Sequence, residues 1–188
     1  MKFLIAGLGN IGPEYKNTRH NIGFQILDTL GSATNSSFND KGYGFVAEYK
    51  YKGRTFILLK PTTYMNLSGR AVNYWLQKEK IPLEKMLVLV DDIALPFGEL
   101  RMKARGGPGG HNGLQNISDV LGTHNFPRLR FGIGDQFHPG FQVDYVLSDW
   151  SGEEQKVLPE KIDRAIEMIQ SFGTIGIERT MNFYNKRK

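Results

Sequence analysis

The chain has 188 residues, enough for one domain with a sizeable core, and its 40% hydrophobic and 12% aromatic content is typical of a globular rather than a disordered protein. It has no cysteine, which excludes disulfides and thiolate metal sites, and its formal net charge of +5 is compatible with a polyanionic partner. No apolar run approaches the length of a membrane span, so we expect no signal peptide, no membrane association and a location in the reducing cytoplasm.

The apolar pattern predicts an alternation of strands and helices. In chain order, we predict a strand over 2–6, a helix over 25–30, a hairpin of strands over 44–50 and 54–60, a helix over 66–77, strands over 86–90 and 99–104, a helix over 111–121, a strand over 128–133, a helix over 158–172 and a last short helix ending near residue 184. Lys52-Gly53 suits the hairpin turn, Ser151 and Glu154 form a candidate capping box, and Pro159 is expected to interrupt or restart the long helix. The alternation predicts a single α/β domain over 1–188, with a twisted, mixed, mostly parallel sheet flanked by helices.

Polar residues follow three of the predicted strands. The strand over 2–6 leads into Gly7-Leu8-Gly9-Asn10, the second hairpin strand leads towards Asn66, and the strand over 86–90 leads into Asp91-Asp92. In α/β sheets, ligands bind beyond the carboxyl ends of the strands. We therefore expect these three strand ends to converge on one cleft.

The first of these turns matches a dinucleotide-binding pattern, because residues 7–12 read G-x-G-x-x-G after a strand. The residues around this turn do not fit a dinucleotide-binding site. Pro13 and polar residues follow Gly12, so no helix begins where a pyrophosphate would need one, and Asp28 falls inside a helix rather than at the end of a second strand. A nicotinamide-dependent oxidoreductase is thus a weaker alternative than a tight turn that presents Asn10 to the cleft.

His20 is one of four histidines and lies near the start of a predicted helix, with Thr18 as a candidate N-cap. A helix N-terminus disfavours imidazolium, so we expect a neutral His20 that can accept a proton. A carboxylate bonded to the other ring nitrogen would fix the tautomer, and Asp91 is the best candidate. The alternative is a capping or surface histidine, but the neighbouring Asn21 and the acids at the strand ends favour catalysis.

Two further segments each allow a structural and a functional interpretation. Residues 61–69 are either a strand-to-helix turn capped by Asn66 or Ser68, or a turn that presents the Asn66 amide to the cleft, where it both donates and accepts. The glycine-rich residues 106–110 precede His111 and Asn112 and are either a mobile surface loop or a loop that approaches a ligand closely.

Basic residues flank this glycine-rich loop. Arg101, Lys103 and Arg105 alternate along one predicted strand and so share a face, and Arg128 and Arg130 do the same. Charge runs are usually solvated faces, yet two of them beside a His-Asn cleft favour phosphate contacts. An RNA-binding module without catalysis is the second alternative, although the aromatic signature of an RNA-recognition motif is missing from the sequence.

Taken together, these blocks resemble the bacterial-type peptidyl-tRNA hydrolases. They match in family order up to about residue 150, at residues 7–15, 18–24, 60–69, 91–92, 95–98, 109–114 and 129–134. The resemblance implies a cytoplasmic monomer in translation and ribosome rescue that uses no cofactor or metal. Its substrate would be peptidyl-tRNA, and the bond cleaved would be the ester between the peptide and the terminal ribose.

The resemblance also implies roles for individual residues. His20 would be the general base that activates water, with Asp91 as its partner, and Lys103 and Arg130 would contact tRNA phosphates. The implied substrate-binding residues are Asn10, Tyr15, Tyr64, Asn66, His111 and Asn112. Such a site is chemically coherent, because an ester is reactive enough for water deprotonated by a neutral histidine to attack it.

Three positions depart from the family pattern. Ile11 stands where proline is usual, Ala94 where an acid is common, and Asp135 where a basic or polar residue is more usual. None of them is expected to touch His20 or Asp91.

Overall fold

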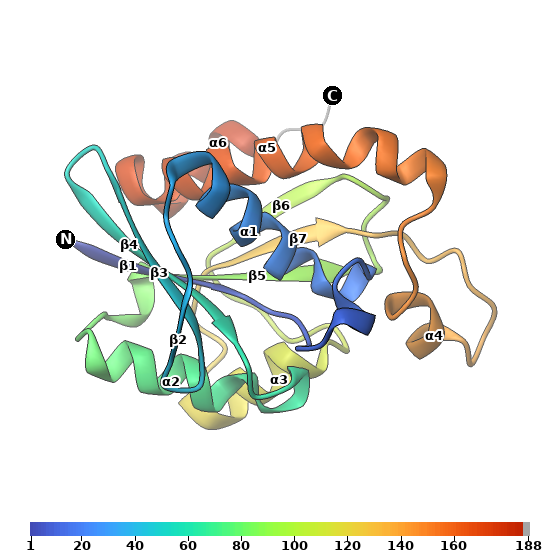
Figure 1. Cartoon of the computed structure of the whole chain (residues 1–188), viewed down its shortest axis with the longest axis horizontal. Helices are drawn as coiled ribbons and strands as arrows, with labels where there is room; N and C mark the ends of the chain where they lie inside the picture. Colours follow the sequence, from blue (N-terminus) through green and yellow to red (C-terminus); the bar gives the residue numbers. More distant parts are fainter. Residues whose placement is uncertain (186–188) are drawn as a thin grey trace.

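The computed structural model describes residues 1–185 and confirms the predicted α/β class (Figure 1). Residues 186–188, which the predicted domain includes, lie outside the described part. A seven-stranded sheet has the order β2-β3-β4-β1-β5-β7-β6. The strands are β1 (Lys2–Gly7), β2 (Asn39–Lys41), β3 (Gly44–Tyr51), β4 (Arg54–Pro61), β5 (Met86–Asp92), β6 (Leu100–Lys103) and β7 (Arg128–Gly132). The central β4, β1, β5 and β7 are parallel, and antiparallel pairs complete both edges.

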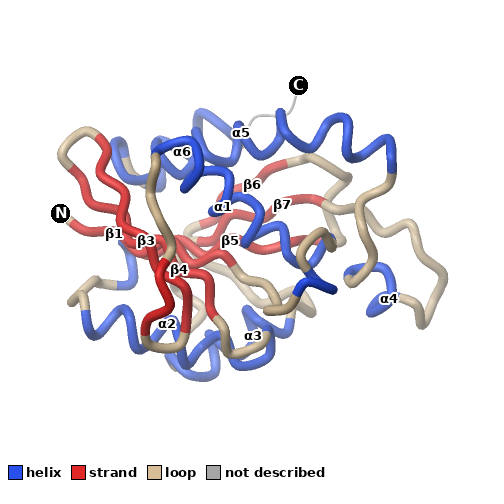
Figure 2. Tube along the Cα trace, in the orientation of Figure 1, coloured by secondary structure: helices blue, strands red, loops and turns tan. Residues whose placement is uncertain are grey.

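Helices cover both faces of the sheet. They are α1 (Ile22–Thr34), α2 (Ser68–Lys78), α3 (Asn112–Leu121), α4 (Gln142–Val146), α5 (Gly152–Ile175) and α6 (Ile177–Tyr184). α1, α5 and α6 lie on one face and α2 and α3 lie on the other. α4 lies beyond the carboxyl ends of the parallel strands (Figures 1 and 2). Among the described residues, no helix is long and apolar enough to cross a membrane.

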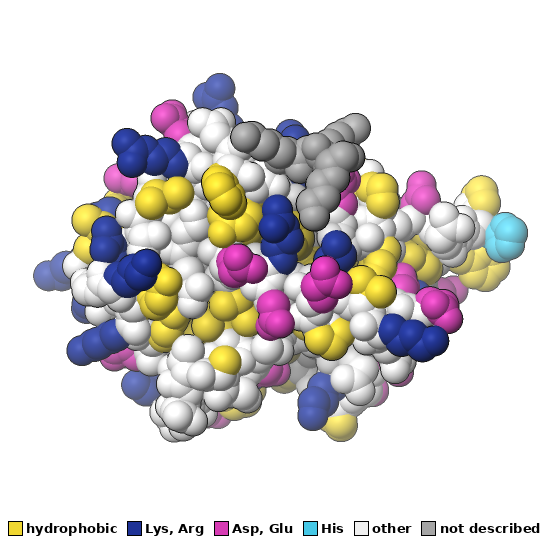
Figure 3. Space-filling view, turned by 90° about the horizontal axis from the view of Figure 1, so that it is seen from above, with side chains coloured by type: hydrophobic (Ala, Val, Ile, Leu, Met, Phe, Trp, Pro, Cys, Tyr) yellow, Lys and Arg dark blue, Asp and Glu magenta, His cyan; other side chains and the backbone are white. Residues whose placement is uncertain are grey.

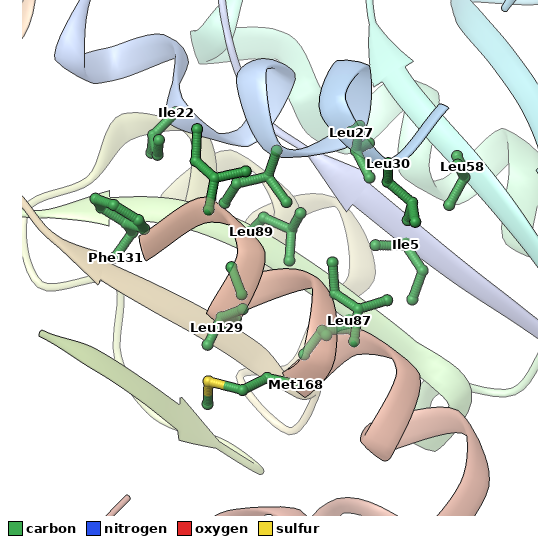
Figure 4. Close-up of a cluster of buried hydrophobic side chains, with 14 of the residues drawn as sticks. Ile5, Ile22, Leu27, Leu30, Leu58, Leu87, Leu89, Leu129, Phe131 and Met168 are labelled. Atoms are coloured by element: carbon green, nitrogen blue, oxygen red, sulfur yellow. The ribbon is translucent and has the colours of Figure 1, made fainter. Parts of the chain in front are cut away.

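The central strands contribute to two cores because successive side chains point to opposite faces. Ile5 and Leu87 pack with residues of α1 and α5 such as Leu27 and Met168 (Figure 4), whereas Leu4 faces α2 and α3. Burial on both faces explains why these strands are continuous apolar runs rather than alternating ones. Because both faces of the central strands are buried, polar functional side chains can lie only at the ends of these strands.

Two of the predicted local features are present and one is not. Lys52 and Gly53 both have positive φ (48° and 77°), as a two-residue type I′ hairpin turn requires. The capping box of Ser151 and Glu154 is present at the start of α5. The predicted break at Pro159 is wrong, because α5 continues through it. Only one helical hydrogen bond is lost there, on an exposed stretch where water can reach the freed carbonyl, while the residues that follow are packed into the core.

Candidate active site

The carboxyl ends of β1, β4 and β5 converge, and Asn10 joins the first two. Its Oδ1 accepts a hydrogen bond of 2.9 Å from the backbone N–H of Met65. The side chain of Asn21 braces Asn10 in turn: Asn10 N–H donates to Asn21 Oδ1, and Asn21 Nδ2 donates to the Asn10 carbonyl, both at 2.9 Å. Because the Asn10 side-chain oxygen is used inside the protein, its amide hydrogens remain as donors for a ligand.

The glycines of the first turn permit close packing rather than pyrophosphate binding. A Cβ on Gly9 would lie 2.8 Å from the ring of Phe24, so the turn rests directly on that ring. Gly12 leads into a short 3-10 helix, Pro13–Tyr15, and α1 begins only at Ile22. The helix N-terminus that a dinucleotide needs is therefore not beside the glycines, which argues against the oxidoreductase alternative.

Asp91 ends the buried part of β5 and lies between two histidines. Its Oδ2 and Oδ1 are 2.9 and 3.0 Å from Nδ1 of His20, and Oδ1 is also 2.9 Å from Nε2 of His111. The two imidazole centroids are 5.0 Å apart. The predicted contact between His20 and Asp91 is thus present, and His111 is a second partner that the sequence did not indicate.

The backbone of α3 determines which nitrogen of His111 carries the proton. His111 is the N-cap of α3, and its Nδ1 accepts hydrogen bonds from the backbone N–H groups of Gly113 (3.1 Å) and Leu114 (3.3 Å). Nε2 must therefore be protonated and donates to Asp91. The resemblance implies that His111 binds substrate, but both of its ring nitrogens are already engaged within the protein.

The carboxylate of Asp91 also determines the tautomer of His20. An ionised carboxylate only accepts hydrogen bonds, so Nδ1 of His20 carries a hydrogen and donates it. Nε2 of His20 is then the basic nitrogen. His20 itself is held by the 3-10 helix Arg19–Asn21, which leads into α1.

The electrostatics of this cluster stabilise the ionised carboxylate. Burial acts to raise the pKa of Asp91, but the charges and hydrogen bonds of His20 and His111 outweigh burial and hold the pKa well below its ordinary value. Burial lowers the pKa of His20, whereas the charge of Asp91 and the hydrogen bond to it raise this pKa, and the net pKa lies above its ordinary value. The expectation that the helix end keeps this pKa low is wrong, because the carboxylate is closer and carries a full charge.

A cavity of about 150 Å³ is lined by His20 and Asp91. Pro108, Gly109 and Gly110 form one wall, so the glycine-rich loop borders a cleft, as its functional interpretation predicts. Another wall is apolar and comes from α4, a helix not predicted from the sequence, through the side chains Val143 and Val146. Ala94, one of the departures from the family pattern, lines the same cavity.

The other implied substrate-binding residues surround this region. Asn112 lines the cavity from the first turn of α3. Asn66 and Tyr64 are exposed at the turn after β4, where Tyr64 has a positive φ of 65°. This turn lies against α3, since a Cβ on Gly113 would be 2.7 Å from the sulfur of Met65.

The candidate caps Asn66 and Ser68 of α2 are wrong, because Leu67 is its N-cap, whereas Thr18 does occupy the N-cap position of the 3-10 helix Arg19–Asn21 but makes no side-chain cap hydrogen bond. The Oγ of Ser68 donates to the Met65 carbonyl instead of accepting from the helix, and Asn66 belongs to the 3-10 helix that precedes α2. The Oγ1 of Thr18 likewise donates, to the carbonyl of half-buried Tyr15. These hydroxyls stabilise the turns that precede the helices rather than the helix ends themselves.

The basic residues differ in their accessibility. The register places Arg101 opposite Arg130 and Lys103 opposite Arg128, so all four point to one face of the sheet, whereas Arg105 lies beyond the end of β6. Lys103 is exposed, and Arg130 lines the cavity with its Nη1 3.6 Å from Asp92. On the opposite side of the molecule, over α5, charges of both signs are interspersed (Figure 3).

Arg128 is neither on a solvated face nor open to a phosphate, so the expectation of phosphate contacts is wrong for this residue. Its side chain is 0% exposed and donates to the carbonyls of Gly106 (2.7 Å), Gly107 (3.2 Å) and His124 (2.9 Å). Burial, helped by the charge of Arg130, lowers the pKa of Arg128 to about 10. Arg128 therefore supports the base of the glycine-rich loop instead of facing solvent.

Arg19 is a structural residue of the site to which sequence reasoning assigned no role. It is buried, its Nη2 pairs with Glu154 at 2.7 Å, and its Nη1 donates to the Asp149 carbonyl at 2.9 Å and to the hydroxyl of Ser148. The guanidinium also lies 4.3 Å above the ring centre of Tyr145. These contacts join the segment that carries His20 to the residues between α4 and α5.

His20, Asp91 and His111 also form a donor set with metal-ligand chemistry, since their ligand atoms lie within 4.8 Å of one another. An ion bound there would replace both histidine–aspartate hydrogen bonds. Nδ1 of His111 would stay occupied by two backbone N–H groups. The donors are thus already satisfied by one another as a hydrogen-bonded cluster.

Comparisons with known proteins give a consistent result. A family model described as peptidyl-tRNA hydrolase matches residues 4–188. The chain is 57% identical to the peptidyl-tRNA hydrolase of Bacteroides fragilis over 187 residues, and 56% identical to that of Cytophaga hutchinsonii over 188 residues, with 100% of each chain covered in both cases. The crystal structure of peptidyl-tRNA hydrolase from Acinetobacter baumannii superposes with a TM-score of 0.92 at 34% identity, covering 99% of this chain and 95% of that one.

Proposed function

The chain belongs to the peptidyl-tRNA hydrolase family, and from this premise we propose that it cleaves the ester between peptide and tRNA with water activated by His20. The observation that carries the proposal is the position of Asp91 between two imidazoles. Since Asp91 accepts a hydrogen bond from Nδ1 of His20, Nε2 is the nitrogen that accepts a proton from water. His20 also borders the cavity where an ester can enter.

In the proposed reaction, Nε2 of His20 removes a proton from a water molecule while the water oxygen attacks the ester carbonyl carbon. The carbonyl π bond opens to an oxyanion. When the tetrahedral intermediate collapses, the bond to the ribose oxygen breaks and that oxygen takes the proton back from Nε2 of His20. The products are free tRNA and a peptide carboxylic acid, which loses its proton to solvent and becomes a carboxylate, and Asp91 stabilises the transient imidazolium without being protonated itself.

Amide side chains supply the donors that this reaction requires. The amide hydrogens of Asn10 are directed away from Met65, because Oδ1 accepts the backbone hydrogen bond. Asn112 lines the cavity at the start of α3, and Asn66 belongs to the turn that packs against α3. We assign to these three amides the binding of the ester carbonyl and the stabilisation of its oxyanion.

The tRNA part is assigned to the edge of the sheet formed by β7 and β6. Arg130 lies at the cavity and Lys103 farther from it on the same face, a spacing suited to successive phosphates. One chain contains the whole cluster of His20, Asp91 and His111, which supports a monomer as the active form. Because its substrate arises in translation, we place the enzyme in the cytoplasm.

The test is hydrolysis of a labelled peptidyl-tRNA, with the corresponding aminoacyl-tRNA as the substrate control. The variant His20→Ala is expected to lose almost all ester cleavage while it still binds tRNA. His138→Ala, which removes an exposed histidine, serves as the matched control and should keep its activity. Normal turnover by His20→Ala would refute the mechanism, and tRNA binding without peptide release by the unmodified protein would favour the non-catalytic RNA-binding alternative.

A further inference from the structure

A second cavity, of about 270 Å³, borders the site at Asn10 and Asn21. Its apolar lining residues are Ile11, Pro13, Phe24 and Phe45, and we call it the Phe24–Phe45 groove. Its charged lining residues are Lys16, which is exposed at the rim, and the pair of Asp28 and Lys60. Ile11 and Phe45 are half-buried, so their side chains remain accessible to a ligand. Asn10 lines one end of this groove, next to the proposed active site.

The half-buried cation of the groove, Lys60, is already neutralised. The ammonium group of Lys60 pairs with Asp28 and lies within 5.7 Å of the ring centres of Phe24 and Phe45. A third ring, Phe38, is 4.4 Å away. Because a carboxylate and three aromatic faces compensate this charge, Lys60 is poorly suited to a phosphate, and the groove is better suited to an apolar group.

The rings that form the groove are carried by regular elements, Phe24 by α1 and Phe45 by β3. Phe24 lies directly beneath the first turn, where a Cβ on Gly9 would be 2.8 Å from its ring. Phe45 extends from β3 next to Lys60 on β4, to which it is paired in register. A preformed wall of this kind loses little side-chain entropy when a ligand binds.

The order of the strands separates this groove from the tRNA side. Asp91 ends β5, with β7 and β6 and their basic residues on one side of it and β1, β4 and β3 on the other. An ester held at His20 would have its ribose and phosphates directed towards Arg130 and its peptide towards Asn10. The peptide chain would therefore reach the Phe24–Phe45 groove directly after it passes Asn10.

We propose that the Phe24–Phe45 groove binds the side chain of the peptide residue that precedes the esterified one, and that it favours apolar side chains. This inference rests on the proposed function, which places the ester at His20. The esterified residue occupies the space beside Asn10, and one further residue of extended chain, about 3.5 Å, reaches the groove. Ile11, a departure from the family pattern, then becomes a determinant of peptide preference in this chain.

The test compares two substrates on one tRNA, N-acetyl-glycyl-alanyl-tRNA and N-acetyl-leucyl-alanyl-tRNA, by kcat/KM. The unmodified enzyme should prefer the leucyl substrate roughly fivefold, less than an enclosed pocket would give because the groove is open. Phe45→Ala and Ile11→Ala should each reduce this ratio towards one. Phe183→Ala removes an exposed ring on α6 and should leave the ratio unchanged.

The possible outcomes separate the two proposals. Equal kcat/KM for both substrates in the unmodified enzyme would overturn the groove assignment while the hydrolase function stands, and no cleavage of either would overturn both. A second substrate pair varies only the esterified residue. If the variants change the preference at that position instead, the groove binds the esterified side chain and the assignment is wrong. The substrate comparison on unmodified enzyme remains decisive even where a variant folds poorly.

Discussion

Replacement of Asp91 by asparagine should move the ring hydrogen of neutral His20 from Nδ1 to Nε2. Asparagine has one accepting end and one donating end, and His111 must donate through Nε2 because Nδ1 is held by the backbone N–H groups of Gly113 and Leu114. Oδ1 of the new residue therefore turns to His111, and its Nδ2 faces His20. Nδ1 of His20 then has to accept, so the ring hydrogen moves to Nε2, where the base is needed.

The size of the effect follows from this exchange. A serine-protease triad with the corresponding Asp→Asn change loses about 10⁴ in kcat through the wrong tautomer. We expect a loss on the order of 10³ to 10⁴ for Asp91→Asn, which corresponds to about 4–5 kcal/mol of transition-state stabilisation. Binding of tRNA should persist, because Asp91 is buried, whereas Lys103, which we assign to a phosphate, is exposed.

The pH dependence of kcat/KM provides a second test of the same change, because the direction of its shift can be predicted. The base must be unprotonated, so kcat/KM falls as pH drops below the pKa of His20, which lies above its ordinary value of about 6.5 because Asp91 outweighs burial. In Asp91→Asn, burial acts without an opposing carboxylate. The residual activity of the variant should therefore have its acid limb at lower pH than the unmodified enzyme.

The assay is kcat/KM for one peptidyl-tRNA between about pH 5 and 9, with thermal unfolding as a check on the fold. Asp92→Asn is the matched control, since Asp92 is the neighbouring acid and contacts Arg130 and the backbone of Ala94 instead of the histidines. It should lose less than about tenfold, as expected for a rim charge. Activity of Asp91→Asn within tenfold of the control, or an acid limb shifted to higher pH, would refute the reasoning.

Lys103→Ala and Arg130→Ala should each raise KM and reduce the salt dependence of log KM by about one, and a loss confined to kcat would contradict their assignment to phosphates. Arg19→Met should lower the free energy of unfolding by about 2 kcal/mol in urea titrations, because the half-buried carboxylate of Glu154 loses its partner, whereas a change below about 1 kcal/mol would mean that the pair is well solvated. Gly9→Ala should cost about 1–3 kcal/mol, because the new Cβ overlaps the ring of Phe24, and an unchanged melting temperature would show that the turn relaxes freely.

The position of the site was predictable because it depends on a property of the sheet. Parallel strands present their carboxyl ends at one edge, so turns after β1, β4 and β5 had to approach one another whatever the packing of the helices. The contact of His20 with Asp91 follows from the same rule. The contact of His111 with Asp91 does not, because it depends on where α3 packs, which no local pattern specifies.

The buried arginines were not predictable for a related reason. Alternation in β7 indicates that Arg128 and Arg130 share a face, but it does not indicate how much of that face is covered. The carbonyls of the glycine-rich loop cover Arg128 and leave Arg130 at the cavity. Arg19 is likewise buried by residues more than 120 positions away in the chain.

Short elements lacked a signal altogether. β2 consists of three exposed polar residues, Asn39–Lys41, and forms only because β3 offers a free edge. α4 has five residues, too few to show a helical period, yet it provides the apolar wall of the active-site cavity. Both elements depend on tertiary contacts rather than on intrinsic propensity.

The most direct measurement is a pH titration of the ¹⁵N-labelled imidazoles by NMR, with the signals of His20 assigned from the spectrum of His20→Ala. We predict that, above the pKa, Nδ1 of His20 carries the hydrogen and Nε2 does not, and that the pKa exceeds 6.5 and coincides with the midpoint of the acid limb of kcat/KM. A His20 ring protonated on Nε2 in its neutral form, or a pKa that does not match the kinetic midpoint, would contradict the role of His20 as the base.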